Sequence, residues 1–440
     1  MSRRPALAGC EGRRRAMRRI GWGSLALAGT VPGCERSKLG PQGPLDFWAM
    51  GREAEVLVDL LGPFHARHPT VKVRVQQLPW TAAHEKLLTA FAGDALPDLC
   101  QLGNTWLPEF SALDALEPLD DRVAAAGIPR ADYFTGILDT NLMPGADGAS
   151  RLLGVPWYVD TRLLFYRSDL LRAAGHARPP QTWSEWLAAM QDIRRLGGAR
   201  SYGALLPLNE PDPLFALSLQ QGRVLNEDDT RGAFSQPPFR RALDFYAEVF
   251  RQGLAPRMTN TQVSNVWDEF ARGLFAFYVT GPWNIGEFRR RLPAERQRDW
   301  AAAPMPGPDG PGISTAGGSS LVIFKGSRRK EAAWKLISFL SEAETMQRFH
   351  ALTGDLPPRR SAWRVPALAN DPPSQAFARQ LERVRAAPKI PEWERIFQEM
   401  QLTAERVVQG RQGIEAACRE LDAWVDALLE KRRWLRSRQA

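Results

Sequence analysis

An acidic and a basic side chain stand two residues apart in the stretch GVPWYVDTRLLFYRSDLL, residues 154–171. If this stretch is a strand, Asp160 and Arg162 leave the same face, because side chains alternate along a strand with a period of two. A run of proline and aromatic residues, Pro156 to Tyr158, leads into the pair. Three interpretations are open: a buried structural ion pair, a catalytic constellation, or part of a ligand cleft.

Other catalytic and metal-binding motifs are missing from the sequence. It contains no GxxxxGK[ST] loop, no GxGxxG after a strand and no GxSxG motif. His65 and His68 have helical spacing, but no carboxylate or Cys lies in register with them, so we expect no metal and no cofactor. Glycoside hydrolysis needs two opposed carboxylates. No spacing singles out such a pair among the candidates, which are Glu53, Glu55, Asp160 and Glu269.

Tryptophan is the more informative residue type. The chain has 15 Trp against 6 Tyr. Several Trp fall in predicted loops at strand ends: Trp48, Trp80, Trp106, Trp157 and Trp283. Any one of these side chains could simply be packed in a hydrophobic core, but several at the same end of a sheet indicate a binding surface. Indole faces stack on the apolar faces of sugar rings, while nearby Asp, Asn, Glu and Arg side chains bind hydroxyl groups.

The distribution of charge argues against a nucleic-acid partner. The formal net charge is +9, but residues 1–34 hold seven Arg and one Glu, and the final EKRRWLRSRQA holds five basic groups and one acid. The body between them carries about −1. Stacking on bases would require a basic groove beside the aromatic residues. We therefore expect no nucleic-acid binding by the main domain.

Strands alternate with helices in the first part of the body. Strands are predicted at 45–50, 71–79 and 99–103, with helices at 53–69 and 84–97 between them. This order predicts an α/β domain with a largely parallel sheet, in which ligands bind beyond the carboxyl ends of the strands. The residues expected there are Trp48 to Glu55, Pro79, Trp80 and Asn104 to Trp106.

Later segments have weaker but readable patterns. NLMPGADGASRLLG, residues 141–154, resembles a hairpin turn, and Thr182 with Glu185 forms a capping box for a helix at 182–198. Strands are also predicted at 274–281 and 319–324, and helices at 239–253 and 328–341. From 370 onward the chain is predicted to be helical, with breaks at Pro372–Pro373 and 388–391.

The start of the chain is typical of an export signal. RRRAMRRIGWGSLALAGTVPGC, residues 13–34, gives a basic region, an apolar region and small residues before Cys34. Its apolar run is too short to span a membrane. VPGC resembles a lipobox, so we expect lipidation at Cys34, with simple cleavage as the alternative and Met17 as a possible start in place of Met1. Cys100 and Cys418 form neither a disulfide framework nor a metal set by spacing and are expected to be small buried residues.

Seven phrases in a fixed order carry a resemblance that covers nearly the whole body. They begin with FWAMGREAEVLVDLLGPFHARHPTVKVRV and ALPDLCQLGNTWLPEFSALDALEPLDD, followed by GVPWYVDTRLLFYRSDLLRAAG with PPQTWSEW. AFSQPPFRRALDFYAEVFRQGLAP, FARGLFAFYVTGPWNI, GGSSLVIFKGSRRKEAAWKLISFLSEAETMQRFHALTGDLPPR and a helical C-terminus complete the series. The sequence resembles the bacterial extracellular solute-binding proteins of family 1, the sugar-binding components of ABC importers, including maltose- and trehalose-binding relatives.

The resemblance implies a two-lobed α/β fold of the periplasmic binding protein type, with a ligand cleft between the lobes. Three chain crossings are expected, near 159–162, 303–313 and 325–327. Residues 1–34 would be the signal. The first lobe would comprise 35–159 and 304–325, and the second lobe 160–303 and 326–440.

Site residues follow by motif position. Trp48 and Glu53 would lie on the rim of the first lobe, and Asn104 stands where relatives often have Asp, just before Trp106. Tyr158, Asp160 and Arg162 fall at the first crossing, behind an aromatic pair, Trp157 with Tyr158, that would face the cleft. Trp283 corresponds to a stacking aromatic of the second lobe. Gly317–Gly318 permits close backbone approach, and Arg359, with Arg360 as an equal alternative, would reach the cleft.

The expected function is that of an exported carbohydrate receptor at the periplasm or cell surface. It would be a lipid-anchored monomer without enzymatic activity, and it would deliver its ligand to a membrane permease by hinge closure. Glycerol-phosphate or another polar solute is the alternative within the family. A secreted glycoside-processing enzyme is the alternative from another class.

Overall fold

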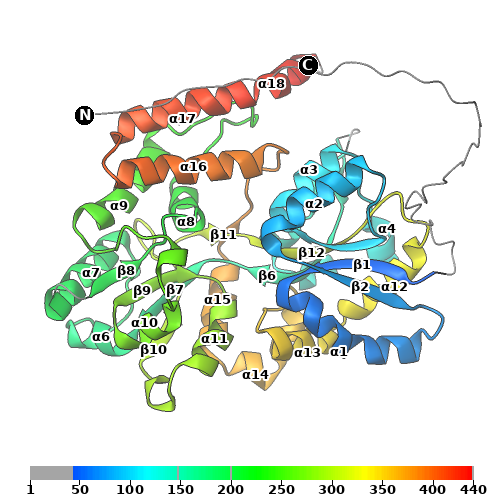
Figure 1. Ribbon diagram of the computed structural model, residues 1–440, viewed down its shortest axis with the longest axis horizontal. Coiled ribbons are helices and arrows are strands. Elements are labelled where there is room, and N and C mark those ends of the chain that lie inside the picture. Colours follow the sequence, from blue (N-terminus) through cyan, green and yellow to red (C-terminus); the bar gives the residue numbers. More distant parts are fainter. Residues whose placement is uncertain (1–42, 146–147, 199–200, 439–440) are drawn as a thin grey trace, which may run out of the picture. The chain divides into compact units, whose positions relative to one another are not determined.

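The computed structural model describes residues 43–145, 148–198 and 201–438. The expected signal segment, with Cys34 and both candidate start residues, lies outside the described residues. Within the described residues, the chain builds one five-stranded and one four-stranded sheet, each with helices on both faces (Figure 1).

The first sheet has the strand order β2-β1-β3-β12-β6. The bounds are β1 Leu45–Met50, β2 Val73–Leu78, β3 Leu99–Gly103, β6 Val155–Asp160 and β12 Gly317–Ile323. β1 pairs in parallel with β2 and β3, whereas β12 runs antiparallel to β3 and β6. The predicted parallel pairing is therefore confirmed for the first three strands, and the sheet as a whole is mixed.

Alternation along β1 separates two hydrophobic layers. Leu45, Phe47 and Ala49 pack in one cluster with α1 (Gly51–Arg67), α12 (Lys330–Leu340) and α13 (Ala343–Thr353). Trp48 and Met50 point the other way and pack in a second cluster with α2 (Trp80–Ala92) and α3 (Leu107–Ala112). The period of two in the strand thus places helices on both faces.

The second sheet has the strand order β10-β7-β9-β8, built from β7 Leu163–Arg167, β8 Tyr202–Leu205, β9 Phe275–Thr280 and β10 Trp300–Ala303. One face packs against α7 (Trp183–Gly197), α8 (Asp212–Gln221), α9 (Pro237–Arg251), α16 (Trp393–Val408) and α17 (Ile414–Leu428). The other packs against α10 (Val266–Arg272), α11 (Trp283–Arg291) and α15 (Pro372–Leu381).

The remaining elements are short. They are α4 Asp120–Ala125, α5 Thr135–Asp139, β4 Leu142–Pro144, β5 Ser150–Leu152, α6 Ser168–Ala173, β11 Ser314–Thr315, α14 Pro366–Ala369, β13 Val384–Arg385 and α18 Glu430–Ser437. Turns of 3₁₀ helix occur at Asn104–Trp106, Arg130–Asp132, Asn260–Gln262, Ala294–Arg296 and Arg360–Arg364. β4 and β5 pair as the predicted hairpin.

The chain passes between the two sheets three times. The first passage is Thr161–Arg162, between β6 and β7, which agrees with the predicted crossing near 159–162. The second runs from the end of β10 to the start of β12, which includes the predicted segment 303–313. The stretch containing Asp160 and Arg162 is therefore two strands in different sheets, joined at the passage.

The third passage lies later than predicted. Ala333, Leu336, Ile337 and Leu340 of α12 pack in the cluster of the first sheet, as does Phe349 of α13. The connection from β12 to α12 is short, so the helix folds back on the sheet that its strand has just joined. The chain reaches the second sheet only after α13, where Trp363 and Leu368 enter its cluster. The crossing expected at 325–327 was therefore wrong, because α12 and α13 still pack on the first sheet and the chain crosses only after them.

Cys100 and Cys418 are buried and free, as predicted. No grouping of His, Cys, Asp and Glu in the described ranges has the arrangement of a metal site. In the same ranges, no helix combines the length and apolar character needed to cross a bilayer.

Candidate ligand-binding site

A cavity of about 530 Å³ lies where the elements of the two sheets face each other. Its wall on the side of the first sheet comes from α1, α2, the turn after β3, and β6. Its wall on the other side comes from α8, α11 and α16. The lining residues that bear functional groups are Glu53, Trp80, Asn104, Thr105, Trp106, Tyr158, Asp160, Arg162, Asp212, Phe215, Trp283, Thr315, Asp355, Trp393, Glu394 and Phe397.

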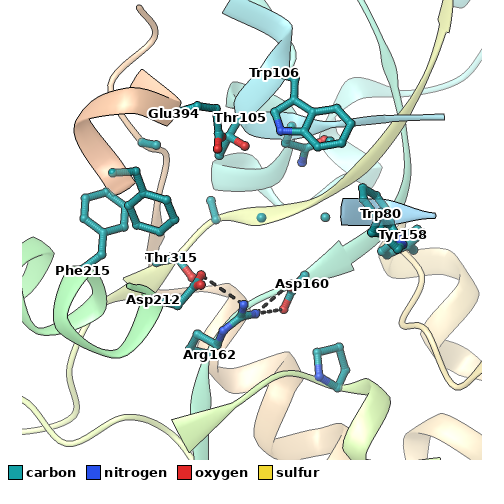
Figure 2. A pocket seen from close by; sticks show the side chains of 18 of the residues that line it. Trp80, Thr105, Trp106, Tyr158, Asp160, Arg162, Asp212, Phe215, Thr315 and Glu394 are labelled. Atoms are coloured by element: carbon teal, nitrogen blue, oxygen red, sulfur yellow. Dashed lines mark hydrogen bonds and ion pairs between the residues drawn. The ribbon is translucent and has the colours of Figure 1, made fainter. Parts of the chain in front are cut away.

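Arg162 links three parts of the cavity wall. Its Nη1 donates to both carboxylate oxygens of Asp160 at 2.7 Å, and its Nη2 lies 3.1 Å from Asp212 Oδ1 (Figure 2). Its guanidinium carbon stands 4.9 Å from the ring centroid of Trp283. Asp160 ends β6 of the first sheet, and Asp212 begins α8, which packs on the second sheet. Arg162, at the first passage, therefore bonds to both halves of the structure.

The charges of this group are strongly coupled. Burial works to lower the pKa of Arg162, but the adjacent Asp160 and Asp212 raise the pKa above its ordinary value. Burial also raises the pKa of Asp160, against the attraction of the arginine. The guanidinium therefore stays cationic and is neutralised by protein carboxylates.

A second polar group centres on Tyr158. Its hydroxyl accepts hydrogen bonds from Gln101 Nε2 at 3.2 Å and Ser319 Oγ at 3.0 Å, and it is also hydrogen-bonded to Glu53. Burial raises the pKa of Glu53. Burial and the charge of Glu53 together raise the pKa of Asp355 well above its ordinary value. These two buried carboxyl groups keep their protons to a higher pH than exposed ones do.

Aromatic side chains form platforms on both walls. Trp80 and Trp106 meet edge to face, with 5.6 Å between ring centroids, on the side of the first sheet. Phe215, Trp393 and Phe397 pack together on the other side. Trp80 and Trp283 remain 37% and 39% exposed, so part of each indole is available to a ligand. Glu394 of α16 lies beside Thr105, which comes from the opposite wall of the cavity (Figure 2).

The structure gathers most of the predicted site residues into this cavity. Those that line it are Glu53, Trp80, Asn104, Trp106, Tyr158, Asp160, Arg162, Trp283 and Gly318. Asn104 accepts from Ser320 Oγ at 2.7 Å, and its Nδ2 has no hydrogen-bond partner among the described residues. The helix α1 begins at Gly51, so Glu53 lies in its first turn, at the carboxyl end of β1 as expected.

Trp48 and Trp157 do not line the cavity, because both are buried in hydrophobic clusters of the first sheet. Trp48 is 3% exposed and packs between β1 and α2, with Lys86 Nζ 5.1 Å from its ring centroid. Trp157 is 2% exposed and packs in the same cluster as Tyr158, with 4.5 Å between its ring centroid and that of Phe349. The expectation of an aromatic pair facing the cleft was wrong for Trp157. The pairing of β6 with β12 shifts register between Ser319 and Ser320, which leaves Trp157 between paired residues, and its ring is buried in the cluster beside Phe349.

Arg359 is also placed away from the cavity. Its Nε donates to Asp132 Oδ2 at 2.7 Å, and its Nη1 donates to the carbonyl of Ser341 at 2.6 Å. The alternative, Arg360, pairs with Glu382 and lies over the ring of Phe134. Both guanidinium groups therefore bond to other segments of the protein. Neither residue lines the cavity, so the prediction that one of them reaches the cleft was wrong.

Several lining residues were not predicted from the sequence. Asp212 and Phe215 lie in α8, whose start is marked by Pro211 and Pro213. Trp393 and Phe397 stand four residues apart on one face of α16, an aromatic spacing visible in the sequence. Nothing local indicates that this C-terminal helix returns to the cavity, because that depends on tertiary packing.

Comparisons with known proteins agree with this architecture. The family model for bacterial extracellular solute-binding proteins matches residues 47–347. The sugar-binding protein MalE of Xanthomonas citri has a TM-score of 0.85 and 55% identity, covering 90% of this chain and 99% of that chain. A Thermotoga lettingae ABC transporter solute-binding protein, solved with α-D-tagatose, has a TM-score of 0.74 and 25% identity, covering 88% and 99%. The diacetylchitobiose-binding protein DasA of Streptomyces coelicolor is 23% identical, over 84% of this chain and 86% of its own.

The match to MalE extends over nearly all of the described residues, so the two sheets correspond to the two lobes of the predicted fold. The cavity lies between these lobes. The chain belongs to the family of bacterial extracellular solute-binding proteins.

Proposed function

We propose that this protein is the extracytoplasmic carbohydrate receptor of an ABC importer. The observation that carries the proposal is the interlobe cavity, which combines exposed indole surface with carboxylate, amide and hydroxyl groups. The relatives named above as sugar-binding proteins support it. The receptor captures its ligand by closing the two lobes about the interlobe passages and presents the closed form to a membrane permease.

Sugar chemistry matches both kinds of group in the cavity. A pyranose ring offers an apolar face to an indole, and Trp80 and Trp283 supply such surfaces on opposite walls. Its hydroxyl groups donate to carboxylates, and Glu53, Asp160 and Asp212 supply these acceptors. We propose that the nine cavity-lining residues predicted from the sequence contact the ligand, together with Asp212, Phe215 and Trp393.

Glycerol-phosphate is the second candidate, and the charge of the cavity disfavours it. The lining contains five carboxylic acids, Glu53, Asp160, Asp212, Asp355 and Glu394, against one guanidinium, Arg162. That guanidinium is already bonded to Asp160 and Asp212. A phosphate ester requires two or more available cationic groups, so a neutral ligand is favoured.

The finer aspects of location and assembly belong to the same proposal. The protein is exported and anchored to the membrane by a lipid at Cys34, and it acts as a monomer with a two-subunit permease and its ATPase. The first lobe comprises the elements from β1 to β6 with β12, α12 and α13. The second lobe comprises β7 to β10 and the elements after α13, in line with the hydrophobic clusters.

A ligand panel tests the proposal. The full-length protein is screened by thermal shift against mono- and disaccharides and against glycerol 3-phosphate, because a ligand that binds only the folded state raises the melting temperature. Each hit is then titrated by calorimetry and incubated with the protein, and the mixture is analysed by chromatography. We expect saturable binding of a neutral sugar that is recovered intact.

Two outcomes would contradict the proposal. If glycerol 3-phosphate binds and no sugar does, the receptor carries a phosphate ester. If the sugar is cleaved and Glu53→Gln or Asp160→Asn abolishes the cleavage, the cavity is an enzyme active site.

A further inference from the structure

The C-terminal helix α18 (Glu430–Ser437) carries a charge pattern that the cavity does not explain. The final 11 residues hold five basic groups and one acid. The helix carries Lys431 and, at three, four and seven residues after it, Trp434, Leu435 and Arg438. Side chains with this spacing share one face of a helix. We call these four residues the outer face of α18.

The outer face is open to solvent. Trp434 is 51% exposed and Leu435 is 44% exposed, and they are adjacent large hydrophobic residues. Lys431 and Arg438 are exposed as well. The guanidinium carbon of Arg438 stands 4.1 Å from the ring centroid of Trp434, and Lys431 forms no hydrogen bond or ion pair with the residues that the structure describes. A small apolar surface is thus framed by two cations.

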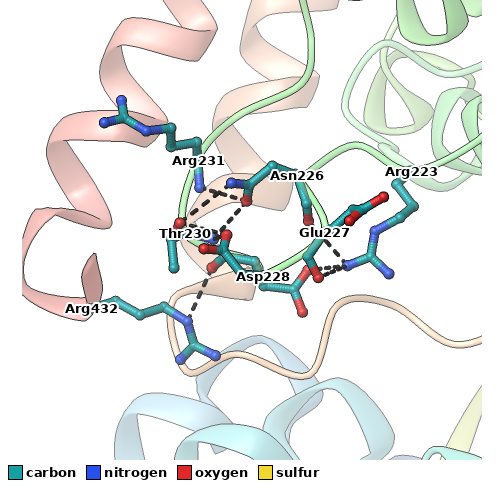
Figure 3. A network of polar contacts seen from close by, with 8 residues as sticks. Arg223, Asn226, Glu227, Asp228, Thr230, Arg231 and Arg432 are labelled. Carbon is teal, nitrogen blue, oxygen red and sulfur yellow. Dashed lines mark hydrogen bonds and ion pairs between the residues drawn. The ribbon is translucent and has the colours of Figure 1, made fainter. Parts of the chain in front are cut away.

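The opposite face of α18 fixes the direction in which the outer face points. Arg432 Nε donates to the carbonyl of Asp229 at 3.0 Å, and Arg433 Nη1 donates to the carbonyl of Thr230 at 2.9 Å. Figure 3 shows Arg432 reaching this turn. Because both bonds come from one side of the helix, they hold Trp434 and Leu435 toward solvent.

The accepting turn is itself rigidly built. Asn226 Oδ1 accepts from the backbone nitrogens of Thr230 at 2.8 Å and Arg231 at 3.0 Å (Figure 3). Asp228 Oδ1 accepts from Thr230 Oγ1 at 2.6 Å. Asp229 has φ of 54°, a left-handed conformation that Asp tolerates better than most residues. The helix is therefore seated on a preformed support.

We infer that the outer face of α18 binds the surface of an anionic phospholipid bilayer. Its charge is complementary to phosphatidylglycerol head groups, and Trp with Leu between basic residues is the composition of an interfacial helix face. Trp434 would lie at the level of the head groups, while Lys431 and Arg438 pair with phosphates. The contact is independent of the proposed sugar-binding function.

The expected strength is modest. Each basic side chain at an anionic surface contributes about fivefold to the partition coefficient, and high salt screens this contribution. One short helix face therefore gives weak and reversible binding, which would orient a receptor that is held at the membrane by other means. This predicts a local response of α18 to lipid, which is measurable in the full-length chain.

A probe at position 437 tests the inference. In the full-length chain, Ser437→Cys carries an environment-sensitive fluorophore one turn from Trp434, with Cys10 and Cys34 replaced by Ser and with Cys100 and Cys418 buried. Vesicles with about 30% phosphatidylglycerol in phosphatidylethanolamine are compared with phosphatidylcholine vesicles. We expect a blue shift with the anionic vesicles alone, and its loss in about 0.5 M salt.

Matched variants separate the outer face from overall charge. Lys431→Glu with Arg438→Glu, or Trp434→Ala with Leu435→Ala, should weaken the response at least about fivefold. Arg195→Glu with Arg272→Glu makes the same change in net charge at side chains that are 76% and 70% exposed elsewhere, and should leave the response unchanged.

Three results would overturn the inference. The probe could show no response to anionic vesicles, the outer-face variants could respond as strongly as the unsubstituted probe protein, or the control variant could lose as much of the response as the outer-face variants. A probe that responds to the solubilised permease complex and not to lipid would assign the outer face to a protein partner.

Discussion

At the scale of the residue, the pair Asp160 and Arg162 is both an ion pair and part of the cavity wall. The sequence predicted the pair because the two residues are near neighbours. It did not predict Asp212, which is the third partner of the group and lies on another element. Packing also decides which aromatic side chains reach the cavity, since Tyr158 lines it whereas Trp157 is buried against Phe349.

Arg162 is predicted to be important for stability as well as for binding. Arg162→Met leaves Asp160 and Asp212 close together without their cation, and because the three side chains are 13–25% exposed the cost is below the roughly 3–5 kcal/mol of breaking a fully buried pair. Urea unfolding of the ligand-free protein should show a clearly lower midpoint. Arg195→Met, at a side chain that is 76% exposed, is the matched control and should change the midpoint little. Equal midpoints for wild type and Arg162→Met would show that the contacts of Arg162 with Asp160 and Asp212 do not stabilise the fold.

Asp355 is predicted to make stability depend on pH. Its pKa is raised in the folded state by burial and by Glu53, so the folded protein holds this proton more tightly than the unfolded chain. The resulting stabilisation is present below the ordinary pKa of 3.8 and is lost as the pH rises through the folded value. Asp355→Asn stays neutral, so its melting temperature should exceed that of wild type at neutral pH and converge with it in acid.

The measurement is the melting temperature of both ligand-free proteins between about pH 4 and 8. Asp59→Asn, at an exposed position, serves as the control and should track wild type throughout. Curves for Asp355→Asn and wild type that run parallel over the whole range would contradict the account of this carboxyl group.

At the scale of the element, helix starts were predicted correctly where the residues that define them are near neighbours in the sequence. The capping box of α7 is confirmed, with Glu185 N donating to Thr182 Oγ1 at 3.1 Å. The break expected at Pro372–Pro373 is confirmed, since α14 ends at Ala369 and the two prolines form the first turn of α15, which Asp371 caps. The boundary near 325–327 failed because no local pattern says which sheet a following helix covers.

Gly318 is predicted to be required by the sheet. It has φ of 123°, and a Cβ at this position would stand 2.2 Å from the carbonyl oxygen of Tyr158. Gly318→Ala should therefore lower stability by about 1–3 kcal/mol and weaken ligand binding, because β6 must shift with Tyr158 and Asp160. Gly326→Ala, at a position with no atom within 4 Å of the added Cβ, is the control. Thermal unfolding and calorimetry of both variants check this, and wild-type behaviour of Gly318→Ala would refute it.

At the scale of the whole molecule, the site is assembled from segments far apart in the sequence. Residues of the first lobe were predictable because ligands bind at the carboxyl ends of parallel strands, and Glu53, Trp80, Asn104 and Trp106 follow β1, β2 and β3. Residues of α8 and α16 were not predictable in the same way. Their place in the cavity depends on how the second lobe packs, which no spacing in the sequence encodes.

The two-lobed architecture predicts a change of shape on binding. The cavity is bounded by both lobes, so a ligand that contacts both walls stabilises a closed arrangement about the interlobe passages. Small-angle scattering of the full-length protein should show a smaller radius of gyration with saturating sugar than without it. A non-binding sugar of the same size provides the control. An identical scattering profile at saturation would mean that binding occurs without closure.

The central claim is that the cavity between the lobes holds the sugar against Trp283. Calorimetric titration of the sugar identified by the panel into wild type, Trp283→Ala and Trp434→Ala tests it most directly. Both tryptophans are partly exposed, at 39% and 51%, so neither truncation should unfold the protein. Loss of the indole platform should weaken binding by about 2 kcal/mol or more, roughly 30-fold, in Trp283→Ala, with wild-type affinity in Trp434→Ala. Unchanged affinity in Trp283→Ala would contradict the claim.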